Sequence, residues 1–148
     1  MGEKVRILVV DDDENILKTF ADVLEDAGYH VDTAKTGEEG IRKSQTDFYH
    51  LALLDIRLPD MEGTELLVRM KDTTPAMVKI MVTGYPSLSN AIEAVNEGAD
   101  GYIVKPVAVD ELLKMIKNHL KKQQEARKYS EEKVKEFVES RVKELGKQ

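Results

Sequence analysis

The 148-residue sequence contains no cysteine and no tryptophan, and aromatic residues make up only 5% of it. The absence of cysteine excludes a disulfide framework and any thiolate metal or redox site. No stretch approaches the roughly 20 apolar residues that a membrane-spanning helix needs. The first residues lack the longer apolar segment of a signal peptide. We therefore expect a soluble, cytoplasmic protein that does not associate with membranes.

Charge is unevenly distributed along the chain. Residues 1 to 106 carry 11 basic and 20 acidic side chains, a net charge of −9, whereas residues 107 to 148 carry 11 basic and 8 acidic ones, a net charge of +3. An acidic body does not favour a nucleic-acid surface. The mixed signs of the C-terminal part are typical of a solvated helix face. We expect no direct nucleic-acid binding by this chain.

Short apolar runs alternate with helical patterns five times. The predicted strands are residues 5–10, 30–34, 51–55, 78–82 and 101–104. Each is followed by apolar residues at helical spacing; Asp13 suits the N-cap of the first helix, and Thr36 with Glu39 forms a capping box for the second. This alternation implies right-handed crossovers and a sheet covered on both faces. The predicted fold class is α/β, with a five-stranded, parallel, doubly wound, flavodoxin-like sheet in residues 1–121.

Four of these strands end at polar side chains. Asp11 and Asp12 follow the first strand, Asp55 ends the third, Thr83 follows the fourth and Lys105 follows the fifth. The carboxyl ends of parallel strands share the edge where ligands bind, so the five side chains should converge. Close carboxylates repel by about 4 kcal/mol per pair at an effective dielectric of 20, so the cluster must be hydrated, protonated or metal-bound. Oxygen ligands suit Mg²⁺, and a lysine with a hydroxyl suits a phosphoryl group, which together indicate an aspartyl-phosphate site.

Five motifs resemble the receiver domain of two-component response regulators. They are Val9-Val10-Asp11-Asp12, Leu53-Leu54-Asp55, Pro59-Asp60-Met61-Glu62-Gly63, Val82-Thr83-Gly84 and Tyr102-Ile103-Val104-Lys105-Pro106. The resemblance covers about residues 5 to 121, with the motifs in the same order and at matching spacings. It implies a signalling switch rather than an enzyme: a domain that accepts a phosphoryl group from a sensor histidine kinase or phosphotransfer protein and later dephosphorylates itself.

The resemblance also implies a role for each residue of the site. Asp55 is the expected phosphoacceptor. Asp12, Asp55 and the backbone carbonyl of Arg57 are the expected ligands of Mg²⁺, with Asp11 acting through a metal-bound water. Lys105 is expected to pair with a phosphoryl oxygen. In the family the peptide bond between the lysine and the following proline is cis, which Lys105-Pro106 permits.

Two further residues are implied to transmit the signal. Thr83 is expected to move and hydrogen-bond the phosphoryl group, and Tyr102 to turn inward as Thr83 moves. The change would alter the face formed by the fourth helix, fifth strand and fifth helix, which then binds a partner or a second copy. The alternative is that Thr83 is a turn residue and Tyr102 a strand-edge aromatic. Arg57 and Tyr85, both bulky, are expected to obstruct the water that hydrolyses the acyl phosphate.

Residues 122–148 lie beyond the resemblance. The apolar spacing lapses between Leu120 and Val134, and Ser130 followed by two glutamates looks like an N-cap. We therefore expect a separate helix of about residues 131–145, with an apolar stripe that packs on its own domain, on a second copy, or on a domain absent from this chain. The alternative is a frayed linker from a longer regulator.

Two other functions compete with the switch. A Mg²⁺-dependent phosphatase of the haloacid dehalogenase type would need a second acid two residues after its nucleophile, where this chain has Arg57. A flavin- or nucleotide-binding module would need a phosphate loop after the first strand, where three aspartates would repel phosphate.

Overall fold

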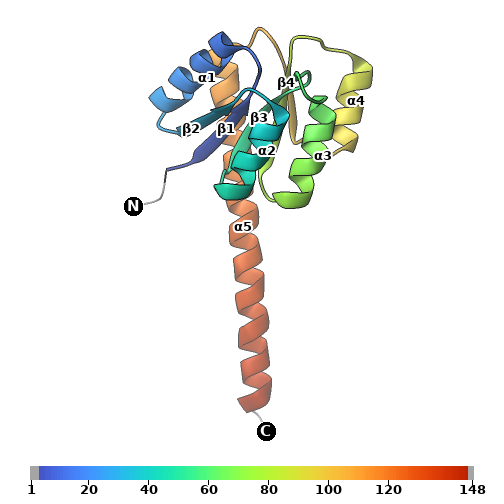
Figure 1. The fold of residues 1–148 in the computed structure, drawn as a ribbon. Helices are drawn as coiled ribbons and strands as arrows, with labels where there is room; N and C mark the ends of the chain where they lie inside the picture. The colour runs from blue at the N-terminus through green and yellow to red at the C-terminus, as the bar shows by residue number, and fades with distance from the viewer. Residues whose placement is uncertain (1–3, 147–148) are drawn as a thin grey trace.

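The computed structural model describes residues 4 to 146, and for Thr73 only the backbone. It contains a five-stranded parallel sheet in the order β2-β1-β3-β4-β5, so the predicted fold class is confirmed (Figure 1). In chain order the elements are β1 (Arg6–Val10), α1 (Glu14–Asp26), β2 (His30–Ala34), α2 (Gly37–Thr46), β3 (Leu51–Asp55), α3 (Gly63–Thr73), β4 (Val78–Thr83), α4 (Leu88–Asn96), β5 (Gly101–Val104) and α5 (Val109–Gly146).

The hydrophobic core has two layers, one on each face of the sheet. Leu8, Leu54 and Met81 point to one face, where α2, α3 and α4 cover them. Alternate residues such as Val9 and Leu53 point to the other face, under α1 and α5. Because side chains alternate along a strand and both faces are covered, the central strands are continuous apolar runs rather than alternating ones.

Local signals set the ends of the first two helices. The Asp13 side chain accepts hydrogen bonds from the backbone N–H groups of Asn15 and Ile16, which confirms Asp13 as an N-cap. Thr36 accepts from the N–H of Glu39 in the same way. The Glu39 carboxylate, however, accepts from the N–H of Lys35 rather than from Thr36, so the capping box is displaced by one residue.

The expectation of a separate C-terminal helix is wrong. Residues 131–145 are helical, but as the last part of α5, which runs without interruption from Val109 to Gly146. Ser130 lies inside this helix, and the ion pair between Arg127 and Glu131 (3.4 Å) crosses the predicted boundary. Once α5 is nucleated against the sheet, each added residue costs little, and the polar stretch is rich in good helix formers. The end of the apolar spacing marks where α5 leaves the domain, while the helix continues.

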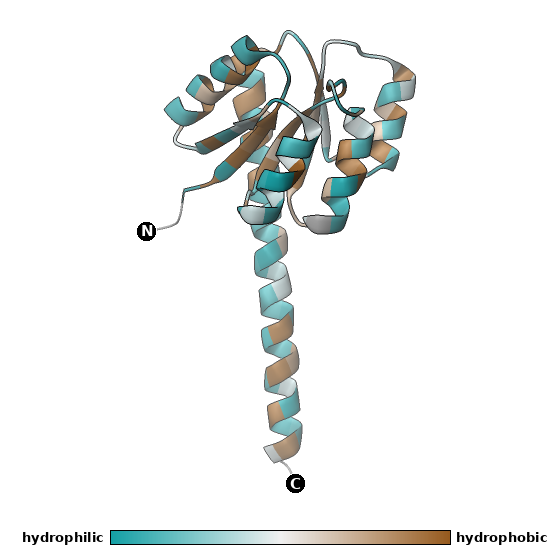
Figure 2. Cartoon of the chain, viewed as in Figure 1, coloured by the Kyte–Doolittle hydropathy of each residue, from teal (hydrophilic) through white to brown (hydrophobic). Residues whose placement is uncertain are grey.

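Within residues 4 to 146, no helix combines the length and the apolar character that crossing a bilayer requires. Along the projecting part of α5, hydrophilic residues are interspersed with hydrophobic ones, as the hydropathy colouring of Figure 2 shows.

Candidate functional site

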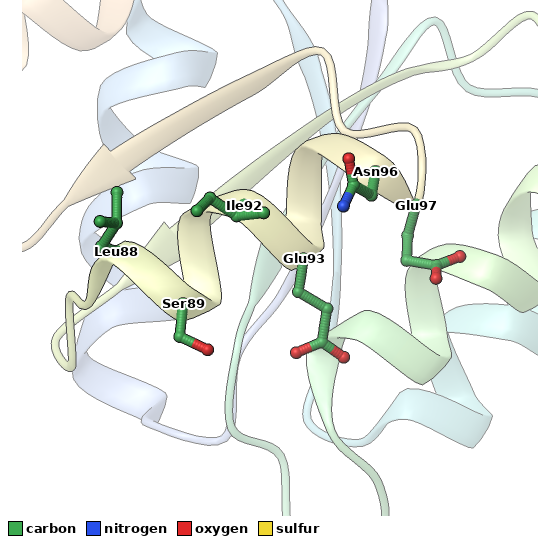
Figure 3. Close-up of a pocket in the computed structure, with 6 residues that line it drawn as sticks. All are labelled: Leu88, Ser89, Ile92, Glu93, Asn96 and Glu97. Atoms are coloured by element: carbon green, nitrogen blue, oxygen red, sulfur yellow. The ribbon is translucent and has the colours of Figure 1, made fainter.

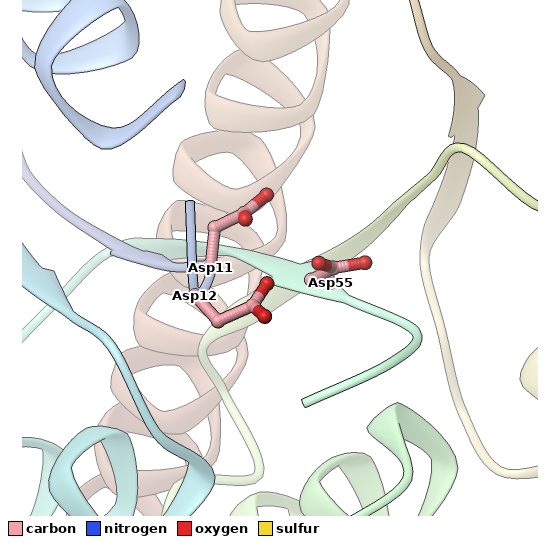
Figure 4. Close-up of side chains that lie close together, drawn as sticks. All are labelled: Asp11, Asp12 and Asp55. Atoms are coloured by element: carbon pink, nitrogen blue, oxygen red, sulfur yellow. The ribbon is translucent and has the colours of Figure 1, made fainter. Parts of the chain in front are cut away.

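The five side chains predicted to converge all lie at the carboxyl edge of the sheet. Asp55 is the last residue of β3, which is flanked by β1 and β4. Asp11 and Asp12 follow β1 directly, and their carboxylates and that of Asp55 gather in one region (Figure 4). Thr83 ends β4, and Lys105 follows β5, where its N–H donates to the carbonyl of Thr83.

Three carboxylates form a group that could hold a metal ion. One oxygen from each of Asp11, Asp12 and Asp55 lies within 4.8 Å of the other two. Asp11 and Asp55 are buried, at 3% and 7% exposure, whereas Asp12 is exposed to solvent. This group offers only carboxylate oxygens as ligands, and one side of it is open to solvent. Hard oxygen ligands and room for bound water suit Mg²⁺ better than Zn²⁺ or copper. The residues present therefore fit Mg²⁺.

Lys105 lies between two of these carboxylates. Its Nζ is 2.7 Å from Oδ2 of Asp11 and 3.6 Å from Oδ2 of Asp55. Burial opposes the charged form, but the hydrogen bond to Asp11 and the charge of Asp55 outweigh it and raise the pKa of Lys105. The lysine is therefore a fixed cation beside Asp55 at neutral pH. The Lys105-Pro106 peptide bond is cis, as the resemblance implied.

Asp55 is in an environment that disfavours its charge. Burial, followed by the neighbouring Asp11, raises the pKa of Asp55 to about 6, although Lys105 and the N–H of Arg57 act in the opposite direction. The N–H of Arg57 donates to Oδ1 of Asp55 over 3.3 Å. At pH 7 most of the Asp55 population is ionised, and an added cation would stabilise that form further.

The loop between β3 and α3 is held closed by its own backbone and by one side chain. Arg57 and Glu62 form an antiparallel bridge, and Leu58 donates its N–H to the carbonyl of Met61. The carboxylate of Asp60 accepts from the backbone N–H groups of Gly37 and Glu38, at 2.9 and 3.0 Å. Asp60 thus caps α2 from a distant loop, where its charge also suits the helix dipole.

The sequence alone did not reveal this role of Asp60, which it shows only as part of the motif from Pro59 to Gly63. The consequence is that the loop carrying the Arg57 carbonyl is anchored to α2 on one side and to β3 on the other. A capping contact of this kind contributes about 1 kcal/mol. It limits the freedom of the backbone that follows Asp55.

Thr83 and Tyr102, the two residues expected to transmit the signal, lie in the neighbouring strands β4 and β5. Thr83 is fully buried, and its hydroxyl accepts from the N–H of Tyr85 at 2.9 Å. Tyr102 packs against the core layer under α4. The hydroxyl of Tyr102 is buried without a hydrogen-bond partner among residues 4 to 146. Buried polar groups are rarely left unpaired, so this ring orientation carries an energetic cost.

Arg57 and Tyr85 come from different loops but contact each other. The Arg57 guanidinium carbon lies 4.2 Å from the centre of the Tyr85 ring, in a cation–π contact. Both residues are exposed and follow site residues by two positions, Asp55 and Thr83 respectively. They form a bulky rim beside the carboxylates.

A surface hollow lies away from these side chains. It is lined by Leu88, Ser89, Ile92, Glu93, Asn96 and Glu97, all from α4 or its C-cap (Figure 3). Because one helix supplies every lining residue, the hollow is an open surface rather than a ligand cavity. None of the three carboxylates borders it, nor does Lys105.

Comparison with known proteins agrees with this geometry. Residues 7–117 match the family model described as the response regulator receiver domain. A receiver domain protein (CheY-like) from Methanospirillum hungatei JF-1 is similar, with 50% identity, a TM-score of 0.82, and coverage of 84% of this chain and 99% of that one. A response regulator from Burkholderia pseudomallei, solved with a phosphorylated aspartic acid, a calcium ion and citrate, shares 29% identity at a TM-score of 0.74, covering 84% of this chain and 73% of that one.

Curated relatives are longer proteins. The alginate biosynthesis transcriptional regulatory protein AlgB of Pseudomonas syringae pv. tomato is 38% identical over 107 residues, which are 72% of this chain but 24% of that protein. This chain thus spans about a quarter of AlgB, and 53% of the response regulator ArlR of Staphylococcus saprophyticus. The family match covers most of the sheet domain and the carboxylate edge, and the chain therefore belongs to the receiver domains of two-component response regulators.

Proposed function

We propose that this chain is a phosphorylation-dependent switch in which Asp55 accepts the phosphoryl group. The observation that carries the proposal is the arrangement around Asp55: one carboxylate oxygen from each of Asp11, Asp12 and Asp55 lies within 4.8 Å of the other two, and Nζ of Lys105 lies 3.6 Å from Asp55. The phosphoryl donor is the phosphohistidine of a sensor kinase or phosphotransfer protein, or a small acyl phosphate. The phosphorylated aspartic acid named for the Burkholderia pseudomallei regulator supports this chemistry.

The transfer needs an ionised Asp55. One of its carboxylate oxygens forms the new bond to phosphorus, the bond from phosphorus to the donor's leaving atom breaks, and the leaving group keeps the electron pair. Asp12, Asp55 and the carbonyl of Arg57 are the proposed Mg²⁺ ligands, with Asp11 acting through water, and the ion supplies positive charge to the phosphoryl oxygens when bound. Lys105 then exchanges its contact with Asp55 for a phosphoryl oxygen.

The output of the switch is the face formed by α4, β5 and α5. When the Thr83 hydroxyl turns to the phosphoryl group, it gives up its bond to the N–H of Tyr85 and opens space toward Tyr102. The unpaired hydroxyl of Tyr102 supports a second ring orientation of comparable energy. Exposed apolar side chains on this face offer a docking surface: Tyr85, Leu88, Ile92, Val95, Val104 and Val109.

The two competing functions receive less support. A phosphatase of the haloacid dehalogenase type needs a second acid two residues after its nucleophile. Here that position holds Arg57, which contacts Tyr85, and this disfavours such a phosphatase. Asp11, Asp12 and Asp13 occupy the loop where a nucleotide or flavin phosphate would bind. The absence of direct nucleic-acid binding and a cytoplasmic location stay predictions, since AlgB is a transcriptional regulator and this chain spans a quarter of it.

Incubation with acetyl phosphate tests the proposed function. We expect a mass gain of one phosphate that requires Mg²⁺ and is absent in Asp55→Asn, because the amide is not a nucleophile toward phosphorus. Asp22→Asn serves as a control, since it makes the same substitution at an exposed position of α1 and leaves Asp55 and its neighbours intact. A gain that persists in Asp55→Asn, or sustained turnover of external phosphate esters, would exclude the proposal.

The rim formed by Arg57 and Tyr85 is expected to slow hydrolysis of the acyl phosphate. Replacing both with alanine opens the path of the attacking water, and we expect dephosphorylation about tenfold faster, equivalent to about 1.4 kcal/mol of barrier. The measurement is the loss of phosphate mass over time after acetyl phosphate is removed. Arg42→Ala, an exposed arginine of α2, is the control. An unchanged lifetime in the double variant contradicts this role.

A further inference from the structure

More than half of α5, the longest helix among residues 4 to 146, is exposed to solvent along its whole length. From Gln124 to Gly146 every residue of α5 is exposed, and the helix projects from the domain as a single rod (Figure 1). At about 1.5 Å per residue, residues 123 to 146 extend about 36 Å. Five apolar side chains on this rod are 51% to 69% exposed: Val134, Phe137, Val138, Val142 and Leu145. We refer to them as the tail stripe, and Figure 2 shows apolar colour along this part of the rod.

The tail stripe continues the face of α5 that packs on the sheet. Val134 follows Ile116 by 18 residues, and Val138 follows Leu120 by the same number. Eighteen residues make about five whole turns, so each pair lies on one side of the helix. Ile116 is completely buried under the sheet and Leu120 packs beside it. The same helix face is therefore covered inside the domain and uncovered beyond it.

Gln123 fixes the direction in which the helix leaves. Its side-chain amide donates to the carbonyls of His50 and Ala76, at 2.9 and 3.0 Å. These carbonyls precede β3 and β4, at the edge of the sheet opposite Asp55. Between Gln123 and Leu145 the sequence has neither glycine nor proline, so nothing breaks the helix to fold it back on its own domain.

The charges of the rod permit contact with an identical rod. Residues 122 to 146 carry seven basic and six acidic side chains, whereas residues 1 to 106 have a net charge of −9. Many of these charges pair along the helix, as in Lys133–Glu136 at 3.8 Å and Arg141–Glu144 at 3.5 Å. The acidic domains of two copies therefore repel each other, whereas their nearly neutral rods do not. A strongly acidic or basic partner is not indicated.

We infer that the tail stripe binds the tail stripe of a second copy, in a parallel two-stranded coiled coil. Val134, Val138, Arg141 and Leu145 are spaced four, three and four residues apart, the alternation of core positions in a heptad. Phe137 and Val142 then flank this core on opposite sides, five residues apart. In a parallel pair such flanking positions meet across the interface, so Phe137 of one copy contacts Val142 of the other and the stripe matches itself.

Arg141 is the exception within this core. Its guanidinium pairs with Glu144 and lies 5.3 Å from the ring centre of Phe137. A polar residue at a core position lowers the stability of a coiled coil while favouring one register. The association between the two copies is therefore weak. Replacing Arg141 with an apolar residue should strengthen it.

Sedimentation equilibrium of the full chain without Mg²⁺ or phosphodonor tests the inference separately from the proposed function. We expect a concentration-dependent dimer that Val138→Glu weakens at least about tenfold and Arg141→Leu tightens at least about tenfold. Ser140→Glu adds the same charge on the opposite face of the helix and is expected to leave the dimer unchanged. Circular dichroism confirms that the variants keep their helix.

Three outcomes overturn the inference. They are a monomer at all concentrations, a dimer insensitive to Val138→Glu, and a dimer equally weakened by Ser140→Glu. Because the chain has no cysteine, single replacements test the orientation. Val134→Cys is expected to form a disulfide-linked dimer on mild oxidation. Cross-linking only between Val134→Cys and Leu145→Cys chains, mixed together, would show an antiparallel pair and contradict the arrangement.

Discussion

Replacing Gly63 with alanine is expected to lower the free energy of unfolding by about 3 kcal/mol. A Cβ at this position would lie 2.4 Å from the carbonyl oxygen of Asp55 and 2.6 Å from Cα of Ile56. Both are backbone atoms of the segment that carries the proposed phosphoacceptor, so neither can move without displacing β3 or the start of α3. The close approach exists because Gly63 donates its N–H to the carbonyl of Ile56. Steric exclusion, rather than an unusual backbone angle, requires the glycine.

Urea unfolding of Gly63→Ala and of a matched glycine variant checks this result. Gly84→Ala is the control, because its added Cβ would have Lys105 Cδ at 3.8 Å as its nearest neighbour, an ordinary contact. We expect Gly84→Ala to remain within about 0.5 kcal/mol of the natural protein. Gly63→Ala should also slow phosphoryl uptake from acetyl phosphate, because the backbone of Asp55 has to shift. Equal stability of the two variants would show that the loop accommodates the methyl group.

The sheet could be predicted because both of its faces are buried. In Leu51–Leu54 every side chain is apolar since α1 and α5 cover one face and α2, α3 and α4 the other. Lys79 interrupts the apolar run of β4, yet the remaining apolar residues still predict a strand. Its ammonium is buried and donates to the carbonyls of Thr74 and Met77, so one lysine is accommodated inside the core.

The convergence of the site residues could be predicted for a similar reason. Asp11, Asp55, Thr83 and Lys105 all end or follow parallel strands, and topology alone brings those ends together. Asp60 was missed because its partners, Gly37 and Glu38, are more than 20 residues away in the chain. Nothing near Asp60 distinguishes a distant helix cap from a turn residue. Its role depends on the position of α2, which only the folded chain defines.

The continuous α5 was missed because apolar spacing reports packing rather than helix formation. Between Leu120 and Val134 the helix contacts little except through Gln123, so no apolar face is needed there. Ser130 and the following glutamates match an N-cap as a local pattern, but the preceding residues already form helix. A cap is useful only where a helix begins.

Without Mg²⁺, Asp55→Asn is expected to be more stable than the natural protein at pH 7, by up to about 3 kcal/mol. Burial and the neighbouring Asp11 raise the pKa of Asp55 from 3.8 to about 6, and each unit corresponds to about 1.4 kcal/mol. The folded state therefore holds a proton that the unfolded state releases at lower pH. This contribution to stability is fully present below pH 3.8 and is lost as the pH rises through about 6. Loss of the contact between Lys105 and Asp55 reduces the gain in the variant.

Chemical unfolding of both proteins between pH 4 and pH 7.5 separates this effect from general changes in stability. We expect the advantage of Asp55→Asn to grow with pH and to level off above about pH 7, whereas Asp22→Asn, at an exposed position of α1, should parallel the natural protein. Added Mg²⁺ should stabilise the natural protein more than Asp55→Asn, because the ion binds the folded state through the carboxylate that the variant lacks. Parallel stability profiles for the natural protein and Asp55→Asn would mean that burial and neighbouring charges do not disfavour the ionised form of Asp55. A cation bound between the carboxylates would relieve the repulsion that destabilises the metal-free fold, so the clustering of Asp11 and Asp12 beside Asp55 favours ion binding at the carboxylate proposed to react.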